Sequence, residues 1–520
     1  MYEKGKLTKM KRTKNAVRNI IWGLVNKVVI LLFPFIIRTI LIQKLGSEYL
    51  GLSSLFTSIL EVLNLTELGF SSAIVFSMYK PIAENDTKTI CALMNLYKKI
   101  YRIIGIIILV IGLAITPFLT HLISGTYPED INIYVLYLIY LFNTSITYFL
   151  FAYKSALLTA HQRADITSNV HTIMNIIKYL LQIIVLVTLK NYYIYVLTIT
   201  VTSIANNIVV AYIADKKYPQ YVCKGDITKK EKDDIKKRVG GLMIQKICGT
   251  TRNSLDSIFI SAYLGLTVVA MYSNYYSIIS AIIGISTMLT NAILAGVGNS
   301  IVVDSVEKNY KDMNKFNFMY MWIAGWCTIC LACLYQPFMK IWMGEEYMFS
   351  YGVVVLFCMY FYALKMGDIR YVYAEAKGLW WESKYRAIAE VIANIALNWI
   401  LVKFFGVYGI ILGTLISLLI INFGYGSQIL FKYYFKEQKI SKFFLTHGKY
   451  ALITLGVCII TYFLCNLISI EGILGLILKG IICVVIPNIL YLIVYRRNSE
   501  FEESKKFVFS ILKNFKTRKA

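Results

Sequence analysis

Long apolar segments recur along this chain from one end to the other. Many reach about 18 residues, enough for an α-helix to span the hydrocarbon core of a bilayer. A transmembrane β-barrel would instead show segments of about ten residues with alternating polarity. Hydrophobic residues make up 58% of the sequence and charged residues 16%, against about 25% charged residues in soluble domains. We therefore predict an all-α polytopic membrane protein with about 14 transmembrane helices.

The basic residues predict the orientation of the chain. Although the net charge is +25, Lys and Arg gather in alternate loops, as in membrane proteins whose basic loops stay in the cytoplasm. No soluble basic domain is present to bind nucleic acid. We predict a multi-pass protein of the cytoplasmic (inner) membrane with both termini in the cytoplasm. The basic N-terminus lacks a small-x-small cleavage site, so we interpret the first apolar segment as an uncleaved span.

A short pattern occurs twice, which predicts two similar halves around a shared cavity. Leu45-Gly46 is followed, after four intervening residues, by Gly51-Leu52-Ser53-Ser54. Leu264-Gly265 is followed, again after four residues, by Ala270-Met271-Tyr272-Ser273. The C-terminal tail carries apolar residues among lysines, so we expect it to lie on the surface of a membrane that contains anionic lipids. The predicted parts are an N-terminal lobe (1–215), a cytoplasmic linker (216–240), a C-terminal lobe (241–433), two further spans (434–498) and an amphipathic tail (499–520).

Several charged residues lie inside the apolar segments. A charge at the bilayer centre costs roughly 2.5–3.5 kcal/mol, so such side chains usually face a protein interior or a watery cavity. Arginine in particular suits phosphate, so cations lining a cavity would suit an anionic substrate. The candidate cavity cations are Lys27, Arg38, Lys154, Lys178, Lys246, Arg252 and Lys365. The candidate charge partners or coupling residues are Glu61, Glu67, Asp256 and Asp368.

Some of these charges have a simpler, structural explanation. Arg252 and Asp256 are four residues apart, so they share one face of a helix and can pair. Asp368 and Arg370 form a second potential pair, close to the predicted inner surface. If the two charges of each pair neutralise one another, the pairs stabilise helix packing and do not bind substrate. We favour this structural role for Asp368 and Arg370, and a place in the cavity for Arg252.

No cofactor, metal site or enzymatic activity is predicted. The sequence has no phosphate-binding loop of the GxxxxGK[ST] type, and no long hydrophilic domain for glycosyl transfer. A CxxCxxC motif resembles part of an iron–sulfur signature, but the fourth Cys followed by Pro is absent, so we interpret its cysteines as helix-packing residues. The motif consists of Cys327, Cys330 and Cys333. Four scattered histidines show no metal-binding spacing: His121, His161, His171 and His447.

Three groups of short motifs point to a known family. The first group consists of Leu45-Gly46, Gly51-Leu52, Leu68-Gly69-Phe70 and Ala73. The second consists of Asn253 to Asp256, Leu264-Gly265-Leu266 and Tyr272 to Tyr275. The third consists of Arg370, Lys377-Gly378-Leu379, Lys384-Tyr385-Arg386, Glu390, Asn394, Gly406, Gly409 and Gly413-Thr414. Together they resemble the polysaccharide-export flippases, the Wzx-type branch of the multidrug/oligosaccharidyl-lipid/polysaccharide (MOP) exporter superfamily.

The resemblance implies two six-helix lobes in a MATE-like V arrangement, to which this chain adds a C-terminal helix pair. It also implies that an undecaprenyl-diphosphate-linked oligosaccharide moves from the inner to the outer leaflet by alternating access, for the export of capsule, O-antigen or teichuronic-type polysaccharide. The diphosphate would meet the cavity cations while the polyprenyl tail stays in lipid. A polysaccharide polymerase and other export components are the further partners that it implies.

Three other functions remain open at this point. The extra helix pair is shared with lipid II-type flippases. Multidrug exporters of the same superfamily use buried carboxylates in the N-terminal lobe, and Glu61 and Glu67 keep that function possible. The first span disfavours it, because this span holds Lys27 and Arg38 and no carboxylate. A membrane-embedded glycan polymerase or ligase would need a large outer loop, and the predicted outer loops are short.

Overall fold

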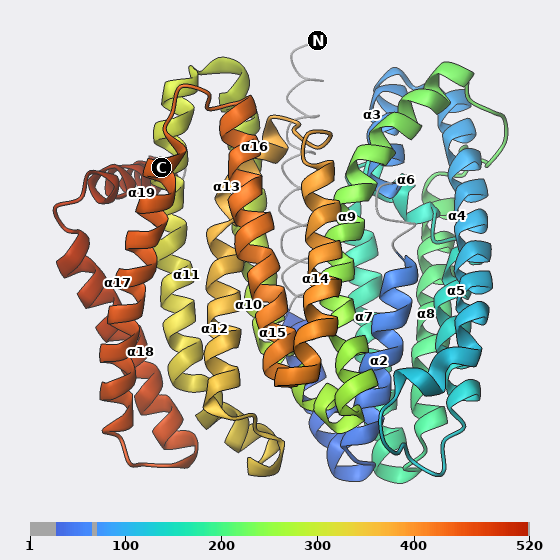
Figure 1. The fold of residues 1–520 in the computed structure, drawn as a ribbon. Coiled ribbons are helices and arrows are strands. Elements are labelled where there is room, and N and C mark those ends of the chain that lie inside the picture. Colours follow the sequence, from blue (N-terminus) through green and yellow to red (C-terminus); the bar gives the residue numbers. More distant parts are fainter. Residues whose placement is uncertain (1–25, 27, 65–69, 518–520) are drawn as a thin grey trace. The chain divides into compact units, whose positions relative to one another are not determined.

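The computed structural model describes residues 26, 28–64 and 70–517, and all regular structure in them is helical (Figure 1). Ten helices among the described residues are long and apolar enough to cross a membrane, or eleven if one bent helix pair is a single span. The all-α, multi-pass prediction is thereby confirmed, although the number of 14 spans is not. Lys27 and Glu67 lie outside the described residues, and the side chain of Lys246 is not described.

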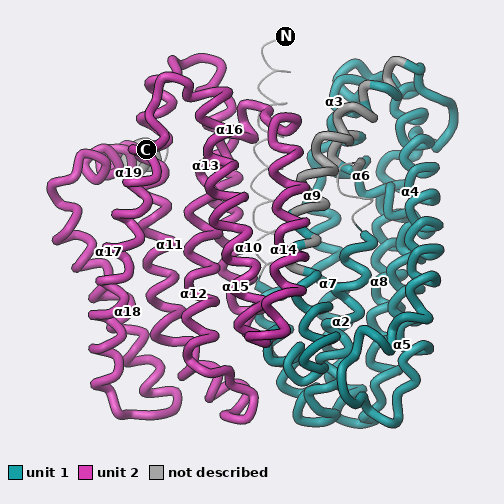
Figure 2. Tube along the Cα trace, in the orientation of Figure 1, with its two compact units in different colours: residues 1–273 teal, residues 274–520 magenta. Residues whose placement is uncertain are grey.

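The described residues divide into two compact units, residues 1–273 and residues 274–520 (Figure 2). The first unit begins with a helix over residues 28–44. Its other helices are α2 (Ser47–Leu63), α3 (Phe70–Glu84), α4 (Thr87–Ile115), η2 (Thr116–Leu122), α5 (Ile133–Phe149), α6 (Lys154–Ala160), α7 (Ala164–Thr188), α8 (Tyr192–Lys217) and α9 (Lys229–Leu264). Helices α5 and α6 meet at an angle of 55° and are the bent pair that raises the number of spans to eleven.

Helix α10 (Leu266–Val303) begins in the first unit and continues into the second. The second unit continues with α11 (Val306–Met343), η3 (Glu345–Tyr347), α12 (Tyr351–Met366), α13 (Asp368–Ala376), α14 (Lys384–Phe405), α15 (Val407–Ser417), the π-helix η4 (Leu418–Tyr425), α16 (Gly426–Tyr433), α17 (Ile440–Asn466), α18 (Gly472–Tyr495) and α19 (Ser499–Thr517).

Aromatic side chains join the C-terminal helices to α11. The ring of Trp322 on α11 lies 5.3 Å from Tyr491 of α18 and stacks at 5.9 Å on Phe501 of α19. The indole of Trp326 donates a hydrogen bond of 2.8 Å to the backbone carbonyl of Cys483. Large aromatic rings bury much apolar surface and give favourable edge contacts. Buried residues of α17 and α18 therefore belong to the core of the second unit, and α19 packs against it through Phe501.

The two copies of the repeated pattern fold alike and contact one another inside the first unit. Gly46 and Gly265 both adopt positive φ angles, +120° and +89°, directly before α2 and α10. Only glycine adopts such angles without strain. Within α2, a Cβ atom on Gly51 would lie 2.2 Å from the backbone oxygen of Leu266. The pattern therefore marks the close contact between α2 and the start of α10.

The start of α4 offers a test of pH dependence outside the spans. The carboxylate of Asp86 accepts hydrogen bonds from the hydroxyl and the backbone N–H of Thr89, and these bonds hold the pKa of this carboxyl below its usual value. A carboxyl with a lowered folded-state pKa stabilises the protein above its unfolded pKa, and this contribution is lost as the pH falls through the folded value. We expect Asp86→Ala to lower the melting temperature at pH 7, and we expect its difference from the wild type to shrink as the pH falls below the usual pKa of an aspartate, measured by thermal unfolding in detergent.

Candidate functional site

Arg38 lies where the two copies of the repeat meet. This half-buried side chain donates a hydrogen bond of 2.6 Å from Nη1 to Oγ of Ser273, and Oγ of Ser54 lies 3.0 Å from the same hydroxyl. Ser54 and Ser273 occupy the same final position in the two copies of the pattern. The sequence interpretation did not assign a role to either serine, although the repeat itself carried the signal.

A line of polar side chains on α7 leads away from Lys178. The ammonium of Lys178 donates to Oδ1 of Asn175 over 2.9 Å, which turns the amide nitrogen of Asn175 toward Nδ1 of His171, 3.1 Å away. The amide nitrogen of Asn26 also lies 3.4 Å from this Nδ1. His171, Asn175 and Lys178 are spaced four and three residues apart, so they share one helical face. That spacing was visible in the sequence and was overlooked there.

Aromatic rings pack beside Lys178. The ammonium of Lys178 lies 4.4 Å from the centroid of the Tyr179 ring, and Tyr179 stacks on Phe33 of the first described helix with centroids 5.1 Å apart. An ammonium above an aromatic face is attracted by the ring quadrupole. In the part of the chain that the structure describes, the contacts of Lys178 are thus an amide and a ring, both neutral.

A polar cavity of about 350 Å³ lies at the other end of the line, inside the first unit. Amides, hydroxyls and an imidazole line it together with two aromatic rings. Such groups offer both hydrogen-bond donors and acceptors, which a ligand rich in hydroxyls requires. The lining residues are Asn26, Tyr101, Phe151, Ala152, Ser155, Thr167, Ser168, His171, Asn206, Asn207 and Val210.

The other candidates of the first unit lie in different surroundings. Lys154 forms an ion pair with Asp215 of α8, so a carboxylate already balances its charge. Arg252 and Asp256 are both buried in α9, and Asp256 accepts a hydrogen bond of 2.8 Å from the hydroxyl of Tyr272.

Glu61 contrasts with these buried groups, because it is exposed on α2. Its carboxylate accepts a hydrogen bond of 3.1 Å from the hydroxyl of Ser254. This bond connects α2 with α9 within the first unit.

In the second unit, the predicted pairing of Asp368 with Arg370 is wrong. Asp368 pairs instead with the buried Lys365, three residues earlier, over 2.7 Å. Side chains two residues apart on a helix point in different directions, whereas those three apart are neighbours. Arg370 donates from Nη2 to Oδ1 of Asn422 over 3.0 Å. The charge of Lys365 is therefore balanced by Asp368.

Arg370 belongs to a buried network that the sequence interpretation did not find. Asn422 lies in the π-helix and donates to both carboxylate oxygens of Glu390, over 3.1 and 2.8 Å. The same carboxylate pairs with Arg386 over 2.7 Å. Gly426 makes room for this network, since a Cβ atom there would lie 2.2 Å from Nη1 of Arg370. Asn422 thus connects two buried guanidinium groups through one carboxylate.

Comparison with known proteins assigns the chain to a recognised group. The sequence profile of a family described as "Polysaccharide biosynthesis protein" matches residues 16–295. A search of curated proteins found no match.

Solved structures share the fold at low sequence identity. A structure titled "Lipid II flippase MurJ, inward closed conformation" is 15% identical, with a TM-score of 0.65, and covers 92% of this chain and 99% of its own. An inward-facing multidrug resistance MATE family transporter of the MOP superfamily is 14% identical, with a TM-score of 0.60 and coverages of 79% and 97%. The Vibrio cholerae MATE transporter VcmN is also 14% identical, with a TM-score of 0.55 and coverages of 83% and 99%. These likenesses confirm the MATE-like fold predicted from the sequence.

Proposed function

This chain belongs to the polysaccharide biosynthesis protein family, and we propose that it is a flippase for undecaprenyl-diphosphate-linked oligosaccharide. Its cargo would cross the cytoplasmic membrane from the inner to the outer leaflet and supply a surface polysaccharide. The proposed orientation places the basic loops and both termini in the cytoplasm. The proposed functional parts are the lobes at residues 1–215 and 241–433, with the linker, the extra helix pair and the tail as predicted.

The observation that carries this proposal is the half-buried Lys178 with its neutral partners. Lys154 and Lys365 each pair with a carboxylate. Among the residues that the structure describes, Lys178 instead contacts the amide of Asn175 and the ring of Tyr179, which leave its charge in place. An ammonium kept in partly apolar surroundings without a carboxylate suits an anionic group of the ligand. The diphosphate is the anionic part of the proposed cargo.

In this proposal each part of the cargo has its own place. The diphosphate would bind at Lys178, with Arg38 as a second cation of the same unit. The sugars would occupy the polar cavity beside His171 and Asn206, and the polyprenyl chain would remain in lipid. Aromatic and amide side chains in that cavity provide apolar faces and hydrogen-bonding groups for a sugar ring. Movement of the negative headgroup outward follows an inside-negative potential by roughly 2.3 kcal/mol per charge per 100 mV.

The test is a translocation assay in proteoliposomes with a labelled undecaprenyl-diphosphate oligosaccharide. We expect Lys178→Met to slow translocation about tenfold, which corresponds to about 1.4 kcal/mol, because the diphosphate loses a charged partner. Lys178→Arg should retain most of the rate. The control is Lys190→Met, since Lys190 is exposed beyond the end of α7. Unchanged translocation by Lys178→Met would refute the role of this lysine.

A lipid II-type flippase is the second candidate, favoured by the likeness to the lipid II flippase structure over 92% of this chain. Both cargoes carry a diphosphate on a polyprenyl chain, so Lys178 and Arg38 would serve either. The sugar part distinguishes them. Unlabelled lipid II should compete poorly with the labelled oligosaccharide lipid if the first proposal is right, and strong competition would favour the second candidate.

A further inference from the structure

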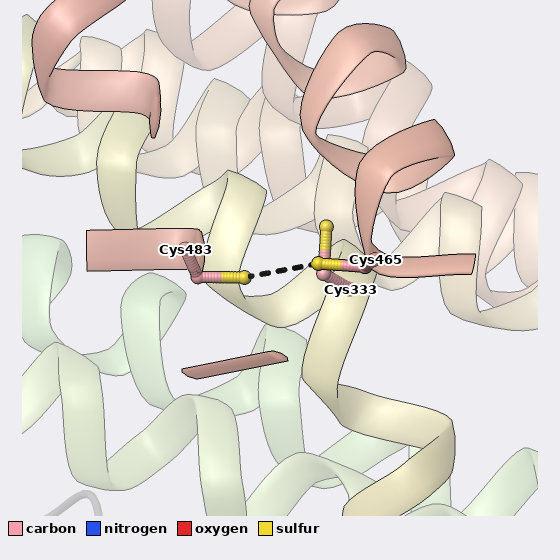
Figure 3. Close-up of side chains that lie close together, drawn as sticks. All are labelled: Cys333, Cys465 and Cys483. Atoms are coloured by element: carbon pink, nitrogen blue, oxygen red, sulfur yellow. Dashed lines mark hydrogen bonds between the residues drawn. The ribbon is translucent and has the colours of Figure 1, made fainter. Parts of the chain in front are cut away.

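Three buried cysteines converge in the second unit, one from each of three helices. Cys333 belongs to α11, Cys465 to α17 and Cys483 to α18. The sulfur atoms of Cys465 and Cys483 lie 3.8 Å apart, and all three sulfurs lie within 4.8 Å of one another (Figure 3). The sequence interpretation treated Cys333 as a packing residue of the CxxCxxC motif. Its two partners lie more than a hundred residues further along the chain.

The spacing of the sulfurs fits a single metal ion. Metal–sulfur bonds of about 2.3 Å place the sulfurs of a tetrahedral site about 3.8 Å apart and those of a trigonal site about 4.0 Å apart. The pair of Cys465 and Cys483 already meets this spacing. Shifts of no more than about 1 Å would bring Cys333 to the same distance. Thiolate ligands select soft ions such as Cu(I) and Zn(II).

A neighbouring cavity supplies a route to the cluster. This cavity of about 580 Å³ is lined by Cys333 and by Gln336, Lys340 and Lys479, among others. Cys465 also approaches the helix of Lys479, since its sulfur lies 3.8 Å from the backbone oxygen of that residue. A fourth ligand of a Zn(II) site can be a water molecule from such a cavity.

A basic residue of the cavity can balance the negative charge of a metal ion bound to three thiolates. Zn(II) with three thiolates carries one negative charge, which is costly within apolar surroundings. Lys479 lines the same cavity and would balance that charge. Lys340 is already paired with Glu345 and Glu471, so Lys479 is the better candidate. Metal binding also requires the thiols to lose their protons, which a nearby ammonium favours.

We infer that Cys333, Cys465 and Cys483 form a binding site for one thiophilic d10 cation, Zn(II) or Cu(I). Such an ion would fasten α17 and α18 to α11. The inference does not depend on the transported substrate. It concerns a different part of the chain from Lys178 and Arg38.

The first experiment measures metal stoichiometry on the full-length protein in detergent. The protein is reduced, stripped with a chelator and dialysed against Zn(II), and in a parallel arm against Cu(I) under anaerobic conditions. We expect about one ion per chain in at least one arm, and less than about a tenth of that in Cys333→Ala, Cys465→Ala and Cys483→Ala. The matched control is Cys358→Ala, because Cys358 is buried in α12 outside the cluster. It should retain the full stoichiometry.

A second experiment uses the wild-type protein, so it remains informative even if a cysteine variant does not fold. Alkylation followed by peptide mass analysis should show Cys333, Cys465 and Cys483 protected by the bound ion, with Cys358 reacting equally in both states. Binding of neither ion by the reduced protein would overturn the inference. So would metal binding that is unaffected by the cysteine variants, or a disulfide between Cys465 and Cys483 in the protein as isolated, since that would make the cluster a redox pair.

Discussion

Replacement of Glu390 by leucine is expected to lower the free energy of unfolding by about 3–5 kcal/mol, the usual cost of breaking a buried ion pair. Glu390 is buried and accepts hydrogen bonds from Arg386 and from the amide of Asn422, which in turn binds Arg370. Without the carboxylate, the buried guanidinium groups of Arg386 and Arg370 lose the negative charge that lies between them. Thermal unfolding of the purified protein in detergent measures the effect.

Two further variants separate this network from a general effect of losing a carboxylate. Glu345→Gln removes an exposed partner of Lys340, and exposed pairs contribute little to stability, so its melting temperature should match that of the wild type. The double variant Glu390→Leu with Arg386→Leu should be more stable than Glu390→Leu alone. The second substitution removes the buried charge of Arg386 that the first leaves without its carboxylate. Equal melting temperatures for Glu390→Leu and Glu345→Gln would show that the network does not stabilise the fold.

The sequence was sufficient to predict the helices that are determined by the hydropathy of their own residues. The last long apolar segment of the predicted N-terminal lobe forms α8, Tyr192–Lys217, because hydropathy and length specify a spanning helix directly. Where apolar and charged stretches adjoin, the boundaries were less certain. Helix α9 begins at Lys229, inside the predicted linker at residues 216–240, and passes through Gly240-Gly241. Its first turns are rich in Lys, which has a high helix propensity, so the helix extends beyond its apolar part.

The candidate site was partly visible in the sequence. His171, Asn175 and Lys178 lie on one helical face by their spacing alone, and their hydrogen bonds follow from it. The network around Asn422 was not visible, because Arg370 and Asn422 are 52 residues apart in sequence and a π-helix leaves no periodic signature. Such contacts arise from tertiary packing, for which one sequence offers no pattern.

The second large effect is expected at Gly51, where α2 meets the start of α10. We expect Gly51→Leu to lower the free energy of unfolding by about 3 kcal/mol, the upper range for overpacking. A Cβ atom at this position lies 2.2 Å from the backbone oxygen of Leu266 and 2.8 Å from its carbonyl carbon. Backbone atoms cannot rotate away as a flexible side chain does, so the two helices must separate.

That separation also has a consequence for transport. Ser54, one helical turn beyond Gly51, contacts Ser273, and Ser273 accepts the hydrogen bond of Arg38. Gly51→Leu should therefore slow translocation as well as lower the melting temperature. The control is Gly456→Leu in α17, where a Cβ atom meets no other atom within 4 Å, and both properties should stay near the wild-type values. If Gly51→Leu melts and transports like Gly456→Leu, the close contact between the repeat segments is not required for either.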